Sequence, residues 1–112
     1  MLSVGNNNKI TLTRGDTLTL ELTLTDSNGD QYVPDEGDSL RFAISEGYEG
    51  GQYYRLKYEQ DISTEDMAFT MPASETKKLE YKEYNYDIEL TRSDGTVDTM
   101  ISSQLKITGE VK

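Results

Sequence analysis

Thr17–Thr25, which reads TLTLELTLT, alternates apolar and polar residues over its whole length. Leucine occupies every second position from Leu18 to Leu24, and threonine or glutamate fills the positions between. Successive side chains of a β-strand point to opposite faces, so this period of two places all the leucines on one face. An α-helix would spread them around its circumference. The stretch therefore predicts a half-buried strand whose threonines add β-propensity.

The same alternation recurs along the chain, and turn residues separate the alternating segments. Asn28-Gly29 and Asp94-Gly95 are typical of tight turns, because both supply residues that tolerate positive φ. Met100 is out of phase with its neighbours, which predicts a bulge or an exposed methionine. Residues 74–79 are long enough for one helical turn with Ser74 as its cap, and a single turn is too short to form a structural layer.

The apolar faces of these segments need a second layer to bury them, since one open sheet would leave them exposed. We therefore predict an all-β fold, an immunoglobulin-like antiparallel β-sandwich of about seven or eight strands. A chain of 112 residues has room for one core, so we expect a single domain over residues 9–112 after a flexible polar lead-in over residues 1–8. The predicted core consists of Ile10, Leu12, Leu18, Leu20, Leu22, Leu24, Leu40, Phe42, Ile44, Leu56, Phe69, Tyr86, Ile88, Leu90, Ile101, Leu105 and Ile107.

One local motif favours the immunoglobulin-like arrangement. Leu79 is followed by Tyr84-Asn85-Tyr86 at the entry to a late strand. Sandwich domains often place a tyrosine at this corner, where its hydroxyl ties the crossing loop to the strand. The Cys–Trp–Cys pattern of antibody domains is absent, since the chain has neither residue type.

Composition restricts the possible functions. The formal net charge is −10, from 21 acidic and 11 basic residues, which disfavours nucleic acid and anionic membranes as partners. The chain has no cysteine and no histidine, which excludes nucleophile–histidine catalysis and thiolate metal sites. Carboxylate pairs remain as an acid–base option, but nothing in the sequence places one in an apolar pocket. We predict a protein that is not an enzyme and that has no cofactor. The N-terminus lacks the features of a signal peptide, and no apolar run is long enough to span a membrane.

Two short motifs resemble ligand-binding sequences, but a simple turn is the favoured interpretation of each. Arg14-Gly15-Asp16 matches an integrin-binding tripeptide, but glycine and aspartate are also common turn residues. Asp26, Asn28 and Asp30 offer oxygen ligands for calcium. The spacing of an EF-hand loop is not met, because Gly29 is misplaced and the closing glutamate is missing. We interpret both as turns, and whether calcium binds at the second stays open.

The candidate interaction surface consists of Tyr48, Tyr53, Arg55 and Lys57. Tyrosine and arginine are enriched in protein interfaces, particularly at the positions that contribute most to binding. Tyrosines also stack against sugar rings. The alternative is an ordinary polar face whose aromatic residues pack on their neighbours.

The order of the turn and strand segments resembles that of small structural proteins of phages and prophages of Gram-positive bacteria, and is similar to the N-terminal immunoglobulin-like domain of the baseplate upper protein. The segments that carry this resemblance are Thr13–Leu20, Thr25–Gly29, Gly37–Phe42, Tyr84–Leu90 and Asp94–Thr99.

The resemblance implies a non-catalytic virion component of a tail, baseplate or fibre, made in the host bacterial cytoplasm, whose partners are other tail subunits or further copies of itself. A long C-terminal region that would carry a receptor-binding head is missing from this sequence. The alternative is an immunoglobulin-like module of a bacterial surface protein that binds carbohydrate or protein.

Overall fold

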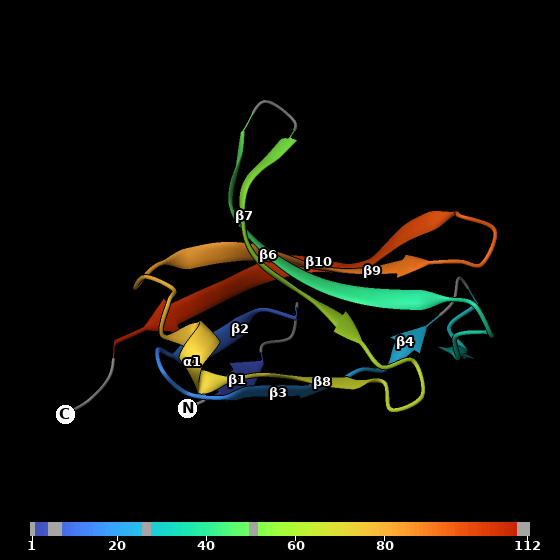
Figure 1. Ribbon diagram of the computed structural model, residues 1–112, viewed down its shortest axis with the longest axis horizontal. Coiled ribbons are helices and arrows are strands. Elements are labelled where there is room, and N and C mark those ends of the chain that lie inside the picture. Colours follow the sequence, from blue (N-terminus) through green and yellow to red (C-terminus); the bar gives the residue numbers. More distant parts are fainter. Residues whose placement is uncertain (1, 5–7, 26–27, 50–51, 110–112) are drawn as a thin grey trace.

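The computed structural model describes residues 2–4, 8–25, 28–49 and 52–109, and the regular secondary structure of these residues is almost entirely β-strand (Figure 1). The prediction of an all-β fold is confirmed. Among the described residues no helix has the length and apolar character needed to cross a bilayer. The elements are β1 (Leu2–Val4), β2 (Ile10–Thr13), β3 (Leu18–Glu21), β4 (Leu24–Thr25), β5 (Gln31–Tyr32), β6 (Ser39–Glu49), β7 (Gln52–Ile62), β8 (Ala68–Met71), α1 (Ala73–Thr76), β9 (Glu83–Thr91) and β10 (Val97–Thr108).

The strands form one large sheet and two small ones. The large sheet has the order β1-β2-β10-β9-β6-β7, and the pairs β3–β8 and β4–β5 form the two small sheets. The ladder between β2 and β10 is parallel, whereas the other ladders of the described strands are antiparallel. The predictions of a purely antiparallel fold and of seven or eight strands are therefore wrong. Strands β2 and β10 come from opposite ends of the chain, so no hairpin forces them to run in opposite directions.

The hydrophobic core lies between the large sheet and the β3–β8 pair, which runs beneath it in Figure 1. Phe42 of β6 marks the contact between the two layers. Its ring centroid lies 4.5 Å from that of Phe69 in β8 and 5.8 Å from that of Tyr86 in β9. Aromatic pairs at these distances add stability beyond the apolar area that they bury.

Most of the predicted core residues are buried, and Leu20, Leu22 and Ile101 are half-buried against the core. Leu56 is the exception, because its side chain is 55% exposed. The β6–β7 register shifts at this point, and each bulge changes which face a side chain occupies. The predicted core omits several hydrophobic residues that are buried, namely Ile62, Met71, Leu79 and Tyr84.

The decisive TLTLELTLT stretch is divided between two sheets. Strand β3 ends at Glu21, and β4 begins at Leu24. Between them, the Leu22 amide donates a hydrogen bond to the Met67 carbonyl at 2.7 Å. The alternation therefore predicts strand conformation correctly, but it does not reveal where the chain changes its pairing partner.

Three local predictions have different outcomes. The bulge near Met100 is confirmed, because the β9–β10 register shifts between Thr99 and Ile101. The cap at Ser74 is wrong. Helix α1 begins at Ala73, and the N-cap position is occupied by Pro72, two residues before Ser74, with no side chain that caps the helix. The lead-in predicted for residues 1–8 contains strand β1, which pairs with β2.

The tyrosine corner is also present. Tyr84 lies at the start of β9 and is 2% exposed. Its hydroxyl accepts a hydrogen bond from the backbone amide of Glu80 at 2.8 Å. This bond fixes the segment that enters β9, which is the role predicted for a tyrosine at this position.

Candidate interaction surface

A two-stranded arm is the most prominent feature of the surface. Strands β6 and β7 each have eleven residues. Their inner halves belong to the large sheet, and their outer halves extend away from the rest of the molecule (Figure 1). The register shifts repeatedly between Ile44 and Tyr48 of β6. Bulges of this kind bend a strand and increase its twist, which is how the arm leaves the plane of the sheet.

The four predicted interface residues all lie on β7 or on the outer half of β6. The ladder places Tyr48 opposite Tyr53. The structure describes the backbone of Tyr48, Tyr53 and Arg55 and does not describe their side chains. Lys57 is exposed, and its Nζ lies 3.5 Å from a carboxylate oxygen of Glu46. The backbone thus brings the four residues into one arm, and their role in binding stays a prediction.

Glu46 holds the base of this arm. Its carboxylate lies 2.5 Å from Lys82 Nζ as well as 3.5 Å from Lys57 Nζ, and its side chain is only 12% exposed. The hydrogen bond from Lys82 is the main cause that lowers the pKa of Glu46, and the charge of Lys57 acts in the same direction. The same hydrogen bond raises the pKa of Lys82. The three charges link β6, β7 and the segment before β9.

A shallow hollow lies on the face of the large sheet that points away from the core. It measures about 170 Å³ and lies beside the base of the arm. Arg41 crosses this face, donating to Glu59 at 2.6 Å and to Glu89 at 3.2 Å. Burial, the largest single influence, lowers the pKa of Arg41. The two carboxylates together outweigh it, so the pKa is raised. The lining residues are Arg41, Ala43, Ser45, Leu56, Asp87 and Glu89.

Asp87 has an unusual environment within this hollow. Its Oδ1 atom is shielded from solvent and has no hydrogen-bond partner among the described residues. A shielded carboxylate oxygen without a donor is costly. This part of the chain therefore leaves one shielded carboxylate oxygen of Asp87 without a donor.

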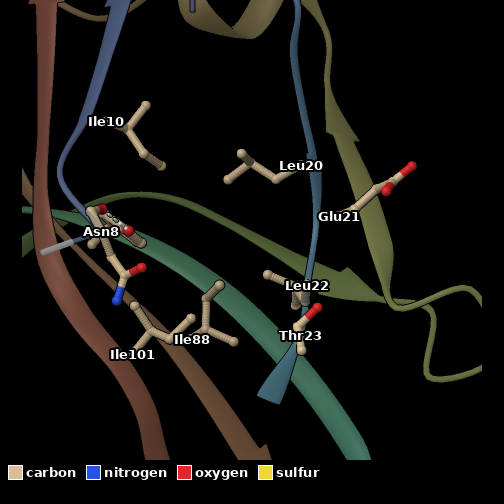
Figure 2. A pocket seen from close by; sticks show the side chains of 9 residues that line it. Asn8, Ile10, Leu20, Glu21, Leu22, Thr23, Ile88 and Ile101 are labelled. Atoms are coloured by element: carbon tan, nitrogen blue, oxygen red, sulfur yellow. Dashed lines mark hydrogen bonds between the residues drawn. The ribbon is translucent and has the colours of Figure 1, made fainter. Parts of the chain in front are cut away.

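A second cleft opens between the two layers near the gap between β3 and β4 (Figure 2). Its volume is about 260 Å³, which is below the usual range of ligand pockets. Leu20 and Leu22 point into it, whereas Glu21 points away. The Tyr86 hydroxyl donates a hydrogen bond to the Asn8 carbonyl, and burial raises the pKa of Tyr86 to about 12. We interpret this cleft as a gap in core packing.

Asp38 joins two loops at one end of the molecule. Its Oδ2 accepts hydrogen bonds from the Asp35 amide and the Tyr32 hydroxyl, and its Oδ1 accepts one from the Ser93 amide. The bond from the Asp35 amide is the largest cause that lowers the pKa of Asp38. Arg92 also donates to Tyr32. Since these groups bind one another, the cluster has a structural role.

The Arg14-Gly15-Asp16 segment is a tight turn between β2 and β3, as predicted. Gly15 has a φ of 88°, and the Asp16 amide donates to the Thr13 carbonyl at 3.0 Å. Arg14 Nε donates to the carbonyls of Lys77 and Leu79, each at 3.0 Å. The arginine therefore anchors the segment after α1.

The possible calcium turn is only partly described. Asp26 lies outside the described residues, and Asn28 and Asp30 lie in an exposed turn. Over residues 2–4, 8–25, 28–49 and 52–109, no group of three or more acidic side chains is positioned to hold a metal ion. The structure therefore adds nothing in favour of calcium.

Comparison with known proteins assigns no relative. No protein-family model matches the sequence, and no curated protein matches it significantly. A proposal about function therefore depends on the geometry of the chain and on the resemblance of its segments.

Proposed function

We propose that the chain is a non-catalytic structural protein of a phage tail, baseplate or fibre, and that it acts through protein–protein contacts. It would be an immunoglobulin-like β-sandwich within a virion, with other tail subunits as its partners. The β6–β7 arm carries this proposal, because its outer half extends beyond the core that stabilises the fold (Figure 1).

The immunoglobulin-like part of the proposal has two supports. The first is the bond between the Tyr84 hydroxyl and the Glu80 amide, which is typical of the corner in such sandwiches. The second is the packing of Phe42 against Phe69, which brings the β3–β8 pair onto the large sheet. Two facing layers with a core between them are what a sandwich requires.

The assembly part is supported by the shape and pairing of the arm. A two-stranded ribbon is marginal in water without further packing, so a long projecting ribbon is costly unless a partner covers it. Strand β7 is also the last strand of the large sheet. An exposed edge strand is a common template for pairing with another chain.

The test is whether the protein occurs in tail particles. Particles would be purified after induction of the bacterium that carries the gene, then examined by mass spectrometry and by antibody labelling in the electron microscope. We expect the protein to sediment with tails and the label to lie on them. Recovery only from the cell wall would contradict the proposal and favour the surface-module alternative, which binding to a glycan array would test further.

A variant with a shortened arm tests the same proposal at the level of the structure. A two-residue turn would replace residues 47–54, and the matched control would be Val33→Ser, at an exposed position away from the arm. Both variants should keep a strand-type circular dichroism spectrum. We expect the shortened arm to abolish incorporation into particles and the control to leave it unchanged. Normal incorporation of the shortened variant would contradict a role for the arm.

A further inference from the structure

The connection between β4 and β5 contains the one asparagine of this chain that precedes a glycine, namely Asn28 before Gly29. Both residues are exposed, and both lie outside the short strands β4 and β5. Gly29 has a φ of 85°, and apart from its chain neighbours no heavy atom of the described residues lies within 4 Å of the place where a β-carbon on it would be. Because glycine has no side chain, nothing at this position hinders the approach of its backbone nitrogen to the side chain of Asn28.

Asparagine is among the thermolabile residues, and before a glycine it can lose its side-chain amide without an enzyme. The glycine nitrogen gives its proton to hydroxide and attacks Cγ of the asparagine, so that a new C–N bond forms and the bond from Cγ to Nδ2 breaks. The side-chain nitrogen takes a proton from water and leaves as ammonia, and a cyclic imide remains. Water then opens this ring at either carbonyl, which gives aspartate or isoaspartate. The net change is the gain of water and the loss of ammonia, so the reaction needs no oxidant or reductant.

We propose that Asn28 is a site of this spontaneous modification in the folded protein, and that aspartate or isoaspartate replaces it as the protein ages. Either product adds a negative charge to a chain whose formal net charge is already −10. Isoaspartate also inserts a methylene group into the main chain between β4 and β5, because the chain then runs through Cγ. The inference does not depend on a role in virions.

The structure disfavours the same ring closure at Asp94-Gly95, where an aspartate precedes a glycine. Oδ1 of Asp94 accepts a hydrogen bond from the Thr96 amide at 2.9 Å, and the Gly95 amide donates to the Arg92 carbonyl at 2.9 Å. The bond from the Thr96 amide is the largest cause that lowers the pKa of Asp94, and an ionised carboxylate is a poor electrophile. This turn therefore engages both the attacking nitrogen and its target in other hydrogen bonds.

Asn85 is protected by its place in the large sheet. It lies in β9, where its neighbours across the two ladders are Ser45 of β6 and Gln104 of β10. The next residue is Tyr86, whose bulky side chain is 3% exposed. Closing a ring here would require β9 to leave its ladders, so we expect Asn85 to keep its amide.

The test follows both asparagines in the full chain, which is incubated in the folded state in neutral and in mildly alkaline buffer. Trypsin cleaves after lysine and arginine, so fragment 15–41 contains Asn28 as its one asparagine and fragment 83–92 contains Asn85 as its one asparagine. Mass spectrometry after a brief digest measures the loss of each amide, and an isoaspartyl methyltransferase labels isoaspartate. We expect progressive conversion at Asn28, faster at alkaline pH because the Gly29 nitrogen must lose its proton, and no measurable conversion at Asn85.

Two variants and one change of solvent locate the cause. Asn28→Gln keeps an amide, but the larger ring that it would form closes far more slowly, so we expect loss of the conversion in fragment 15–41. Asn85→Gln is the matched control and should leave that conversion unchanged. Urea removes the hydrogen bonds that protect Asp94, so fragment 93–106 should gain isoaspartate in the unfolded protein and not in the folded one.

Four results would overturn the inference. The first is an Asn28 amide that persists in the folded chain and is lost only in urea, since the fold would then protect it. The second is equal conversion of Asn28 and Asn85. The third is continued conversion of fragment 15–41 in Asn28→Gln, and the fourth is isoaspartate forming at Asp94 of the folded chain as fast as at Asn28.

Discussion

The inner and outer halves of the β6–β7 hairpin belong to the same two strands but have different surroundings. In the inner half, pairs from Leu40↔Ile62 to Ile44↔Tyr58 follow one another without a shift, and β9 flanks β6 on its other side. In the outer half the register shifts repeatedly, and the ribbon leaves the molecule.

This difference separates the part of the hairpin that stabilises the fold from the part that we propose binds a partner. The inner half contributes Phe42, Ile44 and Ile62 to the core, and all three are nearly inaccessible to solvent. The outer half begins with Leu56 exposed and Lys57 bound to Glu46. Hydrophobic burial therefore supports the first region, and the second is the region that we propose contacts a partner. The predictions below test this division.

The largest expected effect distinguishes two aliphatic residues of the same strand. Ile62→Ala removes a side chain that is 4% exposed, and we expect it to lower the free energy of unfolding by about 2–4 kcal/mol. Leu56→Ala removes one that is 55% exposed, and it should change stability by no more than about 0.5 kcal/mol. Urea unfolding followed by circular dichroism measures both. Equal losses would show that Leu56 belongs to the core and would remove the basis of the comparison.

A smaller effect is expected at the tyrosine corner. Tyr84→Phe keeps the ring and removes the hydroxyl that accepts from the Glu80 amide, so stability should fall by about 1–2 kcal/mol. Tyr81→Phe is the matched control, because Tyr81 is 59% exposed, and its effect should stay within about 0.5 kcal/mol. If the two variants have the same stability, the corner contributes nothing beyond the burial of its ring.

The smallest effect concerns Glu46, at the junction of the two halves. Its pKa is lowered in the folded protein, foremost by Lys82, so its charged form stabilises the fold at neutral pH. This stabilisation is lost as the pH falls below the ordinary range of carboxyl groups, about pH 4. Glu46→Gln lacks the contribution at every pH. We expect the wild type to be more stable than the variant at neutral pH, with the difference shrinking in acid.

Thermal unfolding across this pH range measures the effect on stability, and hydrogen exchange of the amides near Ser45 reports whether the base of the arm opens more often in the variant. A difference that is constant with pH would mean that the charge of Glu46 does not hold the arm.

Much of the fold was predictable, because alternation is a local property. The period of two in Thr17–Thr25 and its repetition along the chain predict strands and an apolar face. Met100 signals the bulge through its broken phase, and the Tyr84-Asn85-Tyr86 segment predicts the corner. Each of these signals lies within a few residues of the feature that it predicts.

The candidate sites were predicted less well. Three glycines over residues 46–51 favour a loop there, whereas β6 continues to Glu49. Leu56 was assigned to the core because alternation gives no sign of a shift in pairing. The hollow at Asp87 joins residues of β6, β7 and β9, which only the folded sheet brings together.

The order of residues was enough to predict that this chain forms strands, which side chains most of those strands bury, and which catalytic and metal chemistries lack their residues. These properties follow from the order and type of neighbouring side chains. Three features are visible only in the folded protein: β2 runs parallel to β10, bulges turn Leu56 outward, and one carboxylate oxygen of Asp87 is shielded from solvent. Register and pairing depend on contacts between residues far apart in the chain, so no local pattern specifies them.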